Sequence, residues 1–113
     1  MALKQGRSNQ RLNIFKNAEM DVQFMRTLSS MSSGGAEIGE CLTVAQLTVD
    51  GDIDSYANAW HEIAQRVERQ AESSLQNRHR KSAKAHYLRA SNYFRSAMSC
   101  LSPKDIRHRE NWA

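Results

Sequence analysis

Hydrophobic residues recur every three or four positions along most of the chain, a spacing typical of α-helices rather than of β-strands. The clearest series runs through Tyr56, Trp60, Ile63, Val67, Ala71 and Ser74, with Leu75 beside it. The next runs through Ala83, Tyr87, Ala90, Phe94, Ala97 and Leu101, with Leu88 and Tyr93 beside it. Ser102-Pro103 stops the second series. This pattern predicts two long helices, at about 54–76 and 80–101, folded back as an antiparallel αα-hairpin.

The first half of the chain predicts shorter helices. Helical spacing over residues 19–31 places apolar side chains at Met20, Phe24, Met25, Leu28 and Met31, and residues 32–35 then break the pattern. A second short helix is expected at 36–47, with Ile38, Leu42, Ala45 and Gln46 as its spaced positions. After the turn at Asp50-Gly51-Asp52, Asp54 or Ser55 is expected to cap the next helix. The predicted fold class is all-α, with short helices followed by a long, tetratricopeptide-like hairpin.

Composition limits what the chain is. It has 113 residues, of which 40% are hydrophobic and 25% charged, enough for a single domain. No apolar run approaches the roughly 20 residues of a membrane helix, so no membrane partner is expected. Cys41 and Cys100 make no disulfide framework, so a reduced, cytoplasmic setting is expected. Residues 1–18 are interpreted as a basic N-terminal arm and residues 19–113 as one helical region.

Charge is unevenly distributed along the chain. The net charge is +4, and residues 61–113 carry eleven Lys and Arg against five acids, whereas residues 17–60 carry one Arg against seven acids. A basic half is one mark of nucleic-acid binding. Here the basic residues alternate with acids such as Glu68 and Glu72, and no aromatic series for base stacking lies among them. A solvated helical face, or one that meets an acidic partner, is therefore favoured over nucleic acid.

The residue patterns predict no catalytic residue, no metal and no cofactor. His61-Glu62 begins like a zinc-protease helix, but Gln65 stands where the second His is needed. The acids of segment 50–54 resemble the start of a calcium loop that lacks its turn glycine and its bidentate acid. No nucleophile elbow or phosphate-binding glycine loop is present in the sequence. Large aromatic residues at helical spacing most often belong to the core; if any residue contacts a substrate, the candidates are Trp60, Tyr87 and Tyr93.

Several strings, together spanning roughly residues 20–101, resemble one family of proteins. They are the runs 34–40, 50–52 and 64–68, the pair Ser55-Tyr56 with Trp60, the pair Ser82-Ala83, and above all Tyr87-Leu88-Arg89-Ala90-Ser91-Asn92-Tyr93-Phe94-Arg95. They are similar to the N-terminal helical region of a family of α/β-hydrolases that includes 2,6-dihydroxypseudooxynicotine hydrolase, fungal polyketide-shortening hydrolases and fermentation-respiration-switch-type esterases. One departure lies at the hairpin turn, where the family has Gly before His. Here Arg78 stands in that place, so Asn77 is expected to supply the left-handed conformation.

The resemblance implies a role for this helical region. In that family it precedes and caps a hydrolase domain that carries the nucleophilic Ser, the acid and the His. The chain would then be the N-terminal fragment of an ester or carbon–carbon bond hydrolase, and it would wall the substrate pocket without catalytic residues of its own. The implied partners are the hydrolase domain of the same protein and a small-molecule substrate; a homodimer is left open. The alternative is a stand-alone helical interaction module of tetratricopeptide-like shape.

Overall fold

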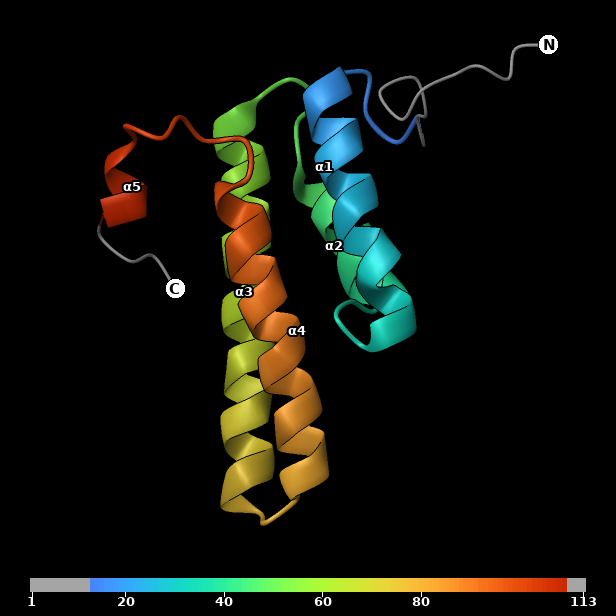
Figure 1. Ribbon diagram of the computed structural model, residues 1–113, viewed down its shortest axis with the longest axis vertical. Helices are drawn as coiled ribbons and strands as arrows, with labels where there is room; N and C mark the ends of the chain where they lie inside the picture. The colour runs from blue at the N-terminus through green and yellow to red at the C-terminus, as the bar shows by residue number, and fades with distance from the viewer. Residues whose placement is uncertain (1–12, 110–113) are drawn as a thin grey trace, which may run out of the picture.

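The computed structural model of the chain describes residues 13–109, and within them every regular element is a helix. The elements in order are α1 (Ala18–Leu28), the 3-10 helix η2 (Ser29–Ser33), α2 (Ile38–Leu47), α3 (Ile53–Gln76), α4 (Arg80–Met98) and α5 (Ile106–Arg109). The predicted all-α class is confirmed. α3 and α4 are the two longest helices and pack side by side as an antiparallel hairpin (Figure 1).

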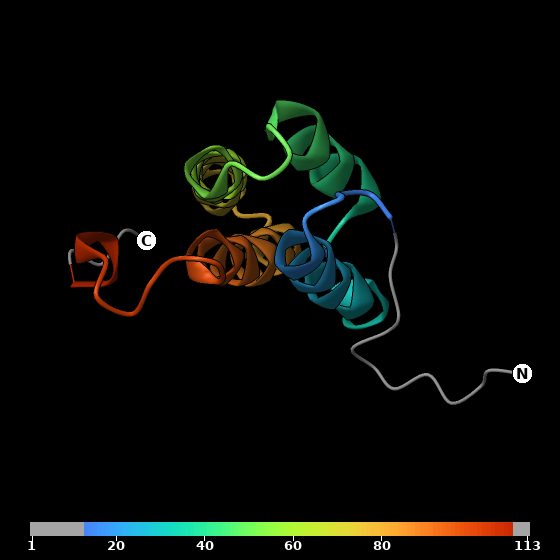
Figure 2. The same cartoon turned by 90° about the horizontal axis from the view of Figure 1, so that it is seen from above.

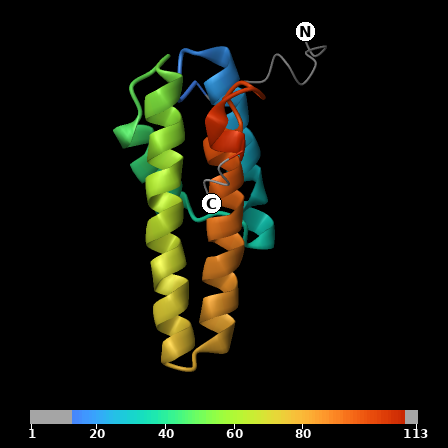
Figure 3. The ribbon, with the colours of Figure 1, turned by 90° about the vertical axis from the view of Figure 1, so that its left-hand side faces the viewer.

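The two short helices α1 and α2 cover only one half of this hairpin. α2 packs on α3 and α1 on α4, both near the end remote from the hairpin turn (Figure 3). Viewed from above, the four helices surround a common centre (Figure 2). In the half next to the turn, α3 and α4 pack only on each other among the described residues.

The hairpin turn differs from the expectation at one residue. Arg78, and not Asn77, adopts the left-handed conformation, with φ of 63° against −91° for Asn77. The amide of His79 donates to the Ser74 carbonyl at 2.7 Å, and that of Arg78 donates to the Leu75 carbonyl at 3.0 Å. These two bonds form a Schellman motif, which requires the left-handed residue one position after the helix cap. The motif's geometry therefore decides the position, although Asn tolerates that conformation better than Arg does.

The ends of α3 and α4 also depart from the prediction. α3 begins at Ile53 because Asp52, rather than Asp54 or Ser55, caps it by accepting from the amides of Asp54 and Ser55. α4 ends at Met98 and not at 101, because the Ser99 hydroxyl and amide both donate to the Ser96 carbonyl and tighten the last turn. At its start α4 has neither a side-chain cap nor an acidic residue in the first turn.

The short helices are displaced from their predicted boundaries as well. α1 ends at Leu28 and continues as η2, because the hydroxyls of Ser29, Ser30 and Ser33 each donate to the carbonyl three residues earlier. α2 begins at Ile38 with Glu37 as its cap. Its buried residues are Cys41 and Val44, whereas the predicted positions Ile38 and Leu42 are each 47% exposed.

Two carboxylates fix the segment before α1. Asp21 is fully buried and accepts from the amides of Asn13, Ile14 and Phe15 at 2.8–3.1 Å. Asp50, in the turn between α2 and α3, accepts from the amides of Lys16 and Asn17, which lower its pKa. These bonds place Phe15 in the core, whereas Ile14 is 43% exposed.

Candidate functional site

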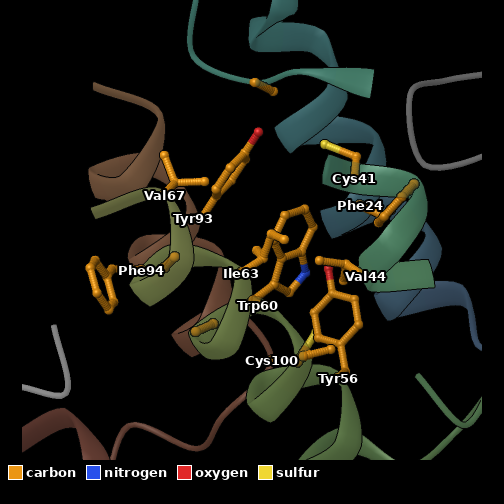
Figure 4. Packing of buried hydrophobic residues seen from close by; sticks show 14 of the residues in the cluster. Phe24, Cys41, Val44, Tyr56, Trp60, Ile63, Val67, Tyr93, Phe94 and Cys100 are labelled. Atoms are coloured by element: carbon orange, nitrogen blue, oxygen red, sulfur yellow. The ribbon is translucent and has the colours of Figure 1, made fainter. Parts of the chain in front are cut away.

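Trp60 lies at the centre of an aromatic cluster where all four main helices meet (Figure 4). Its ring centroid lies 5.3 Å from Tyr93, 5.7 Å from Phe24 and 6.2 Å from Tyr56. These four side chains are fully buried. Burial raises the pKa of the Tyr56 hydroxyl and, to about 11, that of the neighbouring Cys41 thiol. A thiol so held stays protonated near neutral pH, which makes it a packing residue rather than a nucleophile.

A polar network begins where the Tyr93 ring leaves this cluster. The Tyr93 hydroxyl donates to Glu40 Oε1 at 2.6 Å and accepts from the Glu37 amide at 2.9 Å. Arg89 donates to both oxygens of Glu40, from Nε at 2.9 Å and from Nη2 at 3.2 Å. Burial and the hydrogen bond to Glu40 raise the pKa of Tyr93. Burial opposes the charge of Arg89, but the hydrogen bond and charge of Glu40 raise its pKa overall. The network therefore joins α2 to α4 by charge-assisted bonds.

Asn92 extends the contact to the segment between η2 and α2. Its side-chain amide donates to the Gly35 carbonyl at 2.8 Å and to Ser30 Oγ at 2.9 Å. A Cβ on Gly35 would lie 2.8 Å from Ser30 Oγ, so this close approach requires glycine. The strings that carry the family resemblance, 34–40 and 87–95, thus meet in space and hold each other. Sequence reasoning assigned no role to these polar residues.

Two adjoining hollows lie on the solvent side of α4, one on each side of Ser91. One, of about 250 Å³, is lined by Glu68, Tyr87, Ala90, Ser91 and Phe94. The other, of about 330 Å³, is lined by Ser30, Ser33, Gly35, Leu88, Ser91, Asn92 and Arg95. Tyr87 is 38% exposed and its hydroxyl has no hydrogen bond within the described part of the chain. An aromatic wall with a free hydroxyl beside a hollow is suited to contact a small molecule.

The three predicted substrate-contact residues are therefore not together. Trp60 and Tyr93 touch in the core and have no exposed surface, whereas Tyr87 lies at the surface hollow. Tyr93 was expected beside the buried series and Tyr87 within it, and the structure reverses these positions. Substrate contact by any of the three stays a prediction. Tyr87 is the one whose side chain a ligand can reach without displacing the core.

The incomplete metal motifs have other contacts in the structure. The His61 ring packs edge-on against Phe94, with ring centroids 5.6 Å apart. The three acids of the segment 50–54 bind backbone amides or Arg107 rather than facing one another. Residues 13–109 contain no group of three His, Cys, Asp or Glu side chains placed to hold a metal ion.

The chain matches several fungal proteins over 66–86% of its length. It is 41% identical to hydrolase acrC of Aspergillus aculeatus over 75 residues, which are 66% of this chain and 18% of that protein. It is 35% identical to 20-hydroxy-prefusarin hydrolase FUS2 of Gibberella moniliformis over 96 residues, 83% of this chain and 23% of that protein. It is also 35% identical to alpha/beta hydrolase psoB of Aspergillus fumigatus over 97 residues, 86% of this chain and 22% of that protein.

The chain is related to α/β-hydrolases. It spans about a fifth of the length of the curated relatives that it matches. No family model and no solved structure matches it. Within the described residues no helix is long and apolar enough to cross a membrane. The strings 34–40 and 87–95, on which the resemblance to hydrolases rests, are joined in the structure by the polar network.

Proposed function

We propose that this chain is the helical cap region of an α/β-hydrolase, which covers the substrate pocket and supplies no catalytic residue. The observation that carries the proposal is that the match to hydrolases is confined to 18–23% of their length and falls on an all-helical unit. A nucleophile elbow of the α/β-hydrolase type is a turn between a strand and a helix. The catalytic Ser, acid and His are therefore assigned to the part of the hydrolase that this chain does not match.

The cap would act by shaping the pocket and excluding water. Tyr87 offers an exposed ring at a hollow, and it is the preferred substrate contact of this region. Trp60 and Tyr93 would support that wall from the core. The bond cleaved would be an ester or a carbon–carbon bond next to a ketone. A cytoplasmic location is part of the proposal and is supported by Cys41 and Cys100, which are free and buried thiols.

The test is a chimera of the Gibberella moniliformis hydrolase in which the matched segment is replaced by the corresponding residues of this chain. Three proteins are compared on 20-hydroxy-prefusarin: the parent, a deletion of the segment, and the chimera. The deletion should lose turnover and the chimera should recover it. Tyr87→Ala in the chimera should then lower kcat/KM about 10- to 100-fold, the usual effect of losing an apolar pocket contact. Full activity of the deletion would refute the cap role and favour a stand-alone interaction module.

A second measurement concerns the 113-residue chain by itself. Its hydrolysis of aryl and acyl esters should not exceed background, because hydrolysis by a nucleophile needs a base and oxyanion donors placed around it. Turnover by the isolated chain would mean that a catalytic site lies within it.

A further inference from the structure

The larger of the two hollows beside α4 has walls that hydrogen bonds hold together. It measures about 330 Å³ and is lined by residues of η2, of the turn after η2 and of one side of α4. We call it the η2–α4 hollow. Asn92 joins the two walls, because its amide group donates to Ser30 Oγ and to the Gly35 carbonyl. A ligand bound there would meet a fixed wall and would not have to order a loose one.

Most polar groups of the η2–α4 hollow are bound to the protein itself. The hydroxyls of Ser30 and Ser33 donate to backbone carbonyls three residues earlier, and the Asn92 amide group makes the two bonds described above. Ser91 and Arg95 are exposed, and their side chains have no hydrogen bond or ion pair within residues 13–109. The donors that the hollow offers to a ligand are therefore the Ser91 hydroxyl and the Arg95 guanidinium.

The charge that lines the η2–α4 hollow is positive only. None of its lining residues is acidic, and Arg95 carries the permanent charge of a guanidinium. The adjoining hollow carries the opposite charge, because it is lined by Glu68, which has no cationic partner among the described residues. An anion is therefore attracted to the Arg95 side of α4 and repelled from the Tyr87 side. A guanidinium with free N–H groups is suited to bind a carboxylate through two parallel hydrogen bonds.

The end of the η2–α4 hollow opposite Arg95 is apolar. Leu88 is 50% exposed, and its Cδ2 atom lies 3.8 Å from the position that a Cβ would take on Gly34. Leu88 and Arg95 are seven residues apart, so they lie on one side of α4 with about 10 Å between them along the helix axis. An extended chain of about eight carbon atoms covers that distance. The hollow therefore presents a cation at one end and an unoccupied apolar side chain at the other.

We propose that the η2–α4 hollow binds an aliphatic carboxylate, with the carboxylate on Arg95 and Ser91 and the chain along Leu88. The identity of the ligand rests on the proposed function: it is the hydrolase substrate, whose carboxylate lies away from the bond that is cleaved. Since Ser91 lines both hollows, the same molecule reaches Tyr87 across it. Arg95 would then select acids, and Tyr87 would contact another part of the same substrate.

The test uses three eight-carbon probes that differ only in the head group: octanoate, octanol and octylamine. Each is titrated near neutral pH into the isotope-labelled 113-residue chain, and NMR follows the Arg95 Nε–H, the Ser91 amide and the Leu88 methyl groups. Octanoate should bind at least about threefold more tightly than octanol, because an exposed guanidinium–carboxylate pair contributes up to about fivefold in affinity. Octylamine, with its positive charge, should bind more weakly than octanol.

Two variants separate the contact with the head group from the contact with the chain. Arg95→Gln should remove the preference for octanoate and leave the affinity for octanol unchanged. Leu88→Ala should weaken the binding of octanoate and octanol by the same factor, about threefold. Arg69→Gln is the matched control, because Arg69 is an exposed cation of α3 outside the hollow, so its loss changes the net charge equally. It should keep the preference for octanoate.

Three results would overturn the proposal. Octanol may bind as tightly as octanoate, which would leave no role for the cation. Arg69→Gln may lower the preference as much as Arg95→Gln does, which would make net charge the cause. Octanoate may shift the resonances of Tyr87 and Phe94 more than those of Leu88 and Arg95, which would place the anion in the other hollow.

The chimera described above tests whether the ligand is the substrate. Octanoate should raise the KM for 20-hydroxy-prefusarin at constant kcat, and Arg95→Gln in the chimera should weaken this inhibition about threefold. Inhibition that lowers kcat alone would overturn the assignment of the hollow to the substrate. If deletion of the segment abolishes hydrolysis while octanoate and octanol bind equally, the cap role stands and the carboxylate site is refuted. If the isolated chain prefers octanoate through Arg95 while the deletion hydrolyses its substrate normally, the binding site stands and the cap role is refuted.

Discussion

The Tyr93 hydroxyl offers a sharp test of the polar network, because Tyr93→Phe removes one oxygen and leaves the packed ring in place. The lost bond to Glu40 is charge-assisted, and such bonds contribute about 1.5–3 kcal/mol. The Glu37 amide also loses its acceptor and remains partly buried, at a further cost of about 1 kcal/mol. Glu40 keeps both bonds from Arg89, so its carboxylate is not left unpaired. Together these two losses should lower the free energy of unfolding by about 2.5–4 kcal/mol.

Urea unfolding followed by circular dichroism measures this difference. Tyr87→Phe is the matched control, because Tyr87 is 38% exposed and its hydroxyl has no hydrogen bond within the described part of the chain. That variant should stay within about 0.5 kcal/mol of the parent. A double-mutant cycle of Tyr93→Phe with Glu40→Gln should give a coupling of about 1 kcal/mol or more. Equal stabilities for the two tyrosine variants, or a coupling of zero, would refute the reasoning.

Three further predictions follow from the turn, the buried carboxylate and the buried acids. Arg78→Gly should raise the free energy of unfolding by about 1 kcal/mol by relieving the left-handed conformation, whereas Asn77→Gly should bring no gain; thermal unfolding of both variants decides. Asp21→Asn should lower it by about 2–4 kcal/mol, because one of the two oxygens becomes a donor that faces either the Asn13 amide or the amides of Ile14 and Phe15. Proteolysis within residues 13–17 should then accelerate, and an unchanged cleavage rate would contradict this. The free energy of unfolding should fall as pH rises from about 9 to 11. Burial raises the pKa of Cys41 to about 11 and also raises the pKa values of Tyr56 and Tyr93, so the unfolded chain releases protons in this range that the folded chain retains. A free energy of unfolding that stays constant between about pH 9 and 11 would exclude this prediction.

The hairpin could be predicted from sequence because its two series are long and regular. Burial of Ile63, Val67 and Ala71 follows directly from spacing, since a helix of 24 residues repeats the signal over many turns. The orientation of α2 could not be predicted in the same way. Its ten residues contain one charged side chain, so no polar face marks the solvent side. Tertiary contacts, the packing on α3 and the bonds of Glu40 to α4, decide that Cys41 and Val44 face inward.

The candidate site was less accessible to sequence reasoning than the fold. Glu40 and Tyr93 are 53 residues apart, and nothing local marks one as the partner of the other. The only sequence signal was the resemblance in the strings 34–40 and 87–95. Tyr87 and Tyr93 illustrate the same limit, because a shift of a few tens of degrees around α4 exchanges a core position for a surface one. Which of them lies inside depends on how α1 and α2 sit on the hairpin, a tertiary property.

The start of α4, which has neither a side-chain cap nor an acidic residue, gives the chain an unusual response to ionic strength. Arg78, Arg80, Lys81 and Lys84 gather at the positive end of the α4 dipole, and no acid lies in its first turn. These exposed cations repel one another and the dipole over distances shorter than the screening length of dilute buffer, about 30 Å at 0.01 M salt. The Glu40–Arg89 pair is largely shielded from water and is screened far less. Added salt therefore screens this repulsion but leaves the Glu40–Arg89 pair almost unchanged. The free energy of unfolding should rise with salt, whereas it falls in proteins that depend on exposed ion pairs.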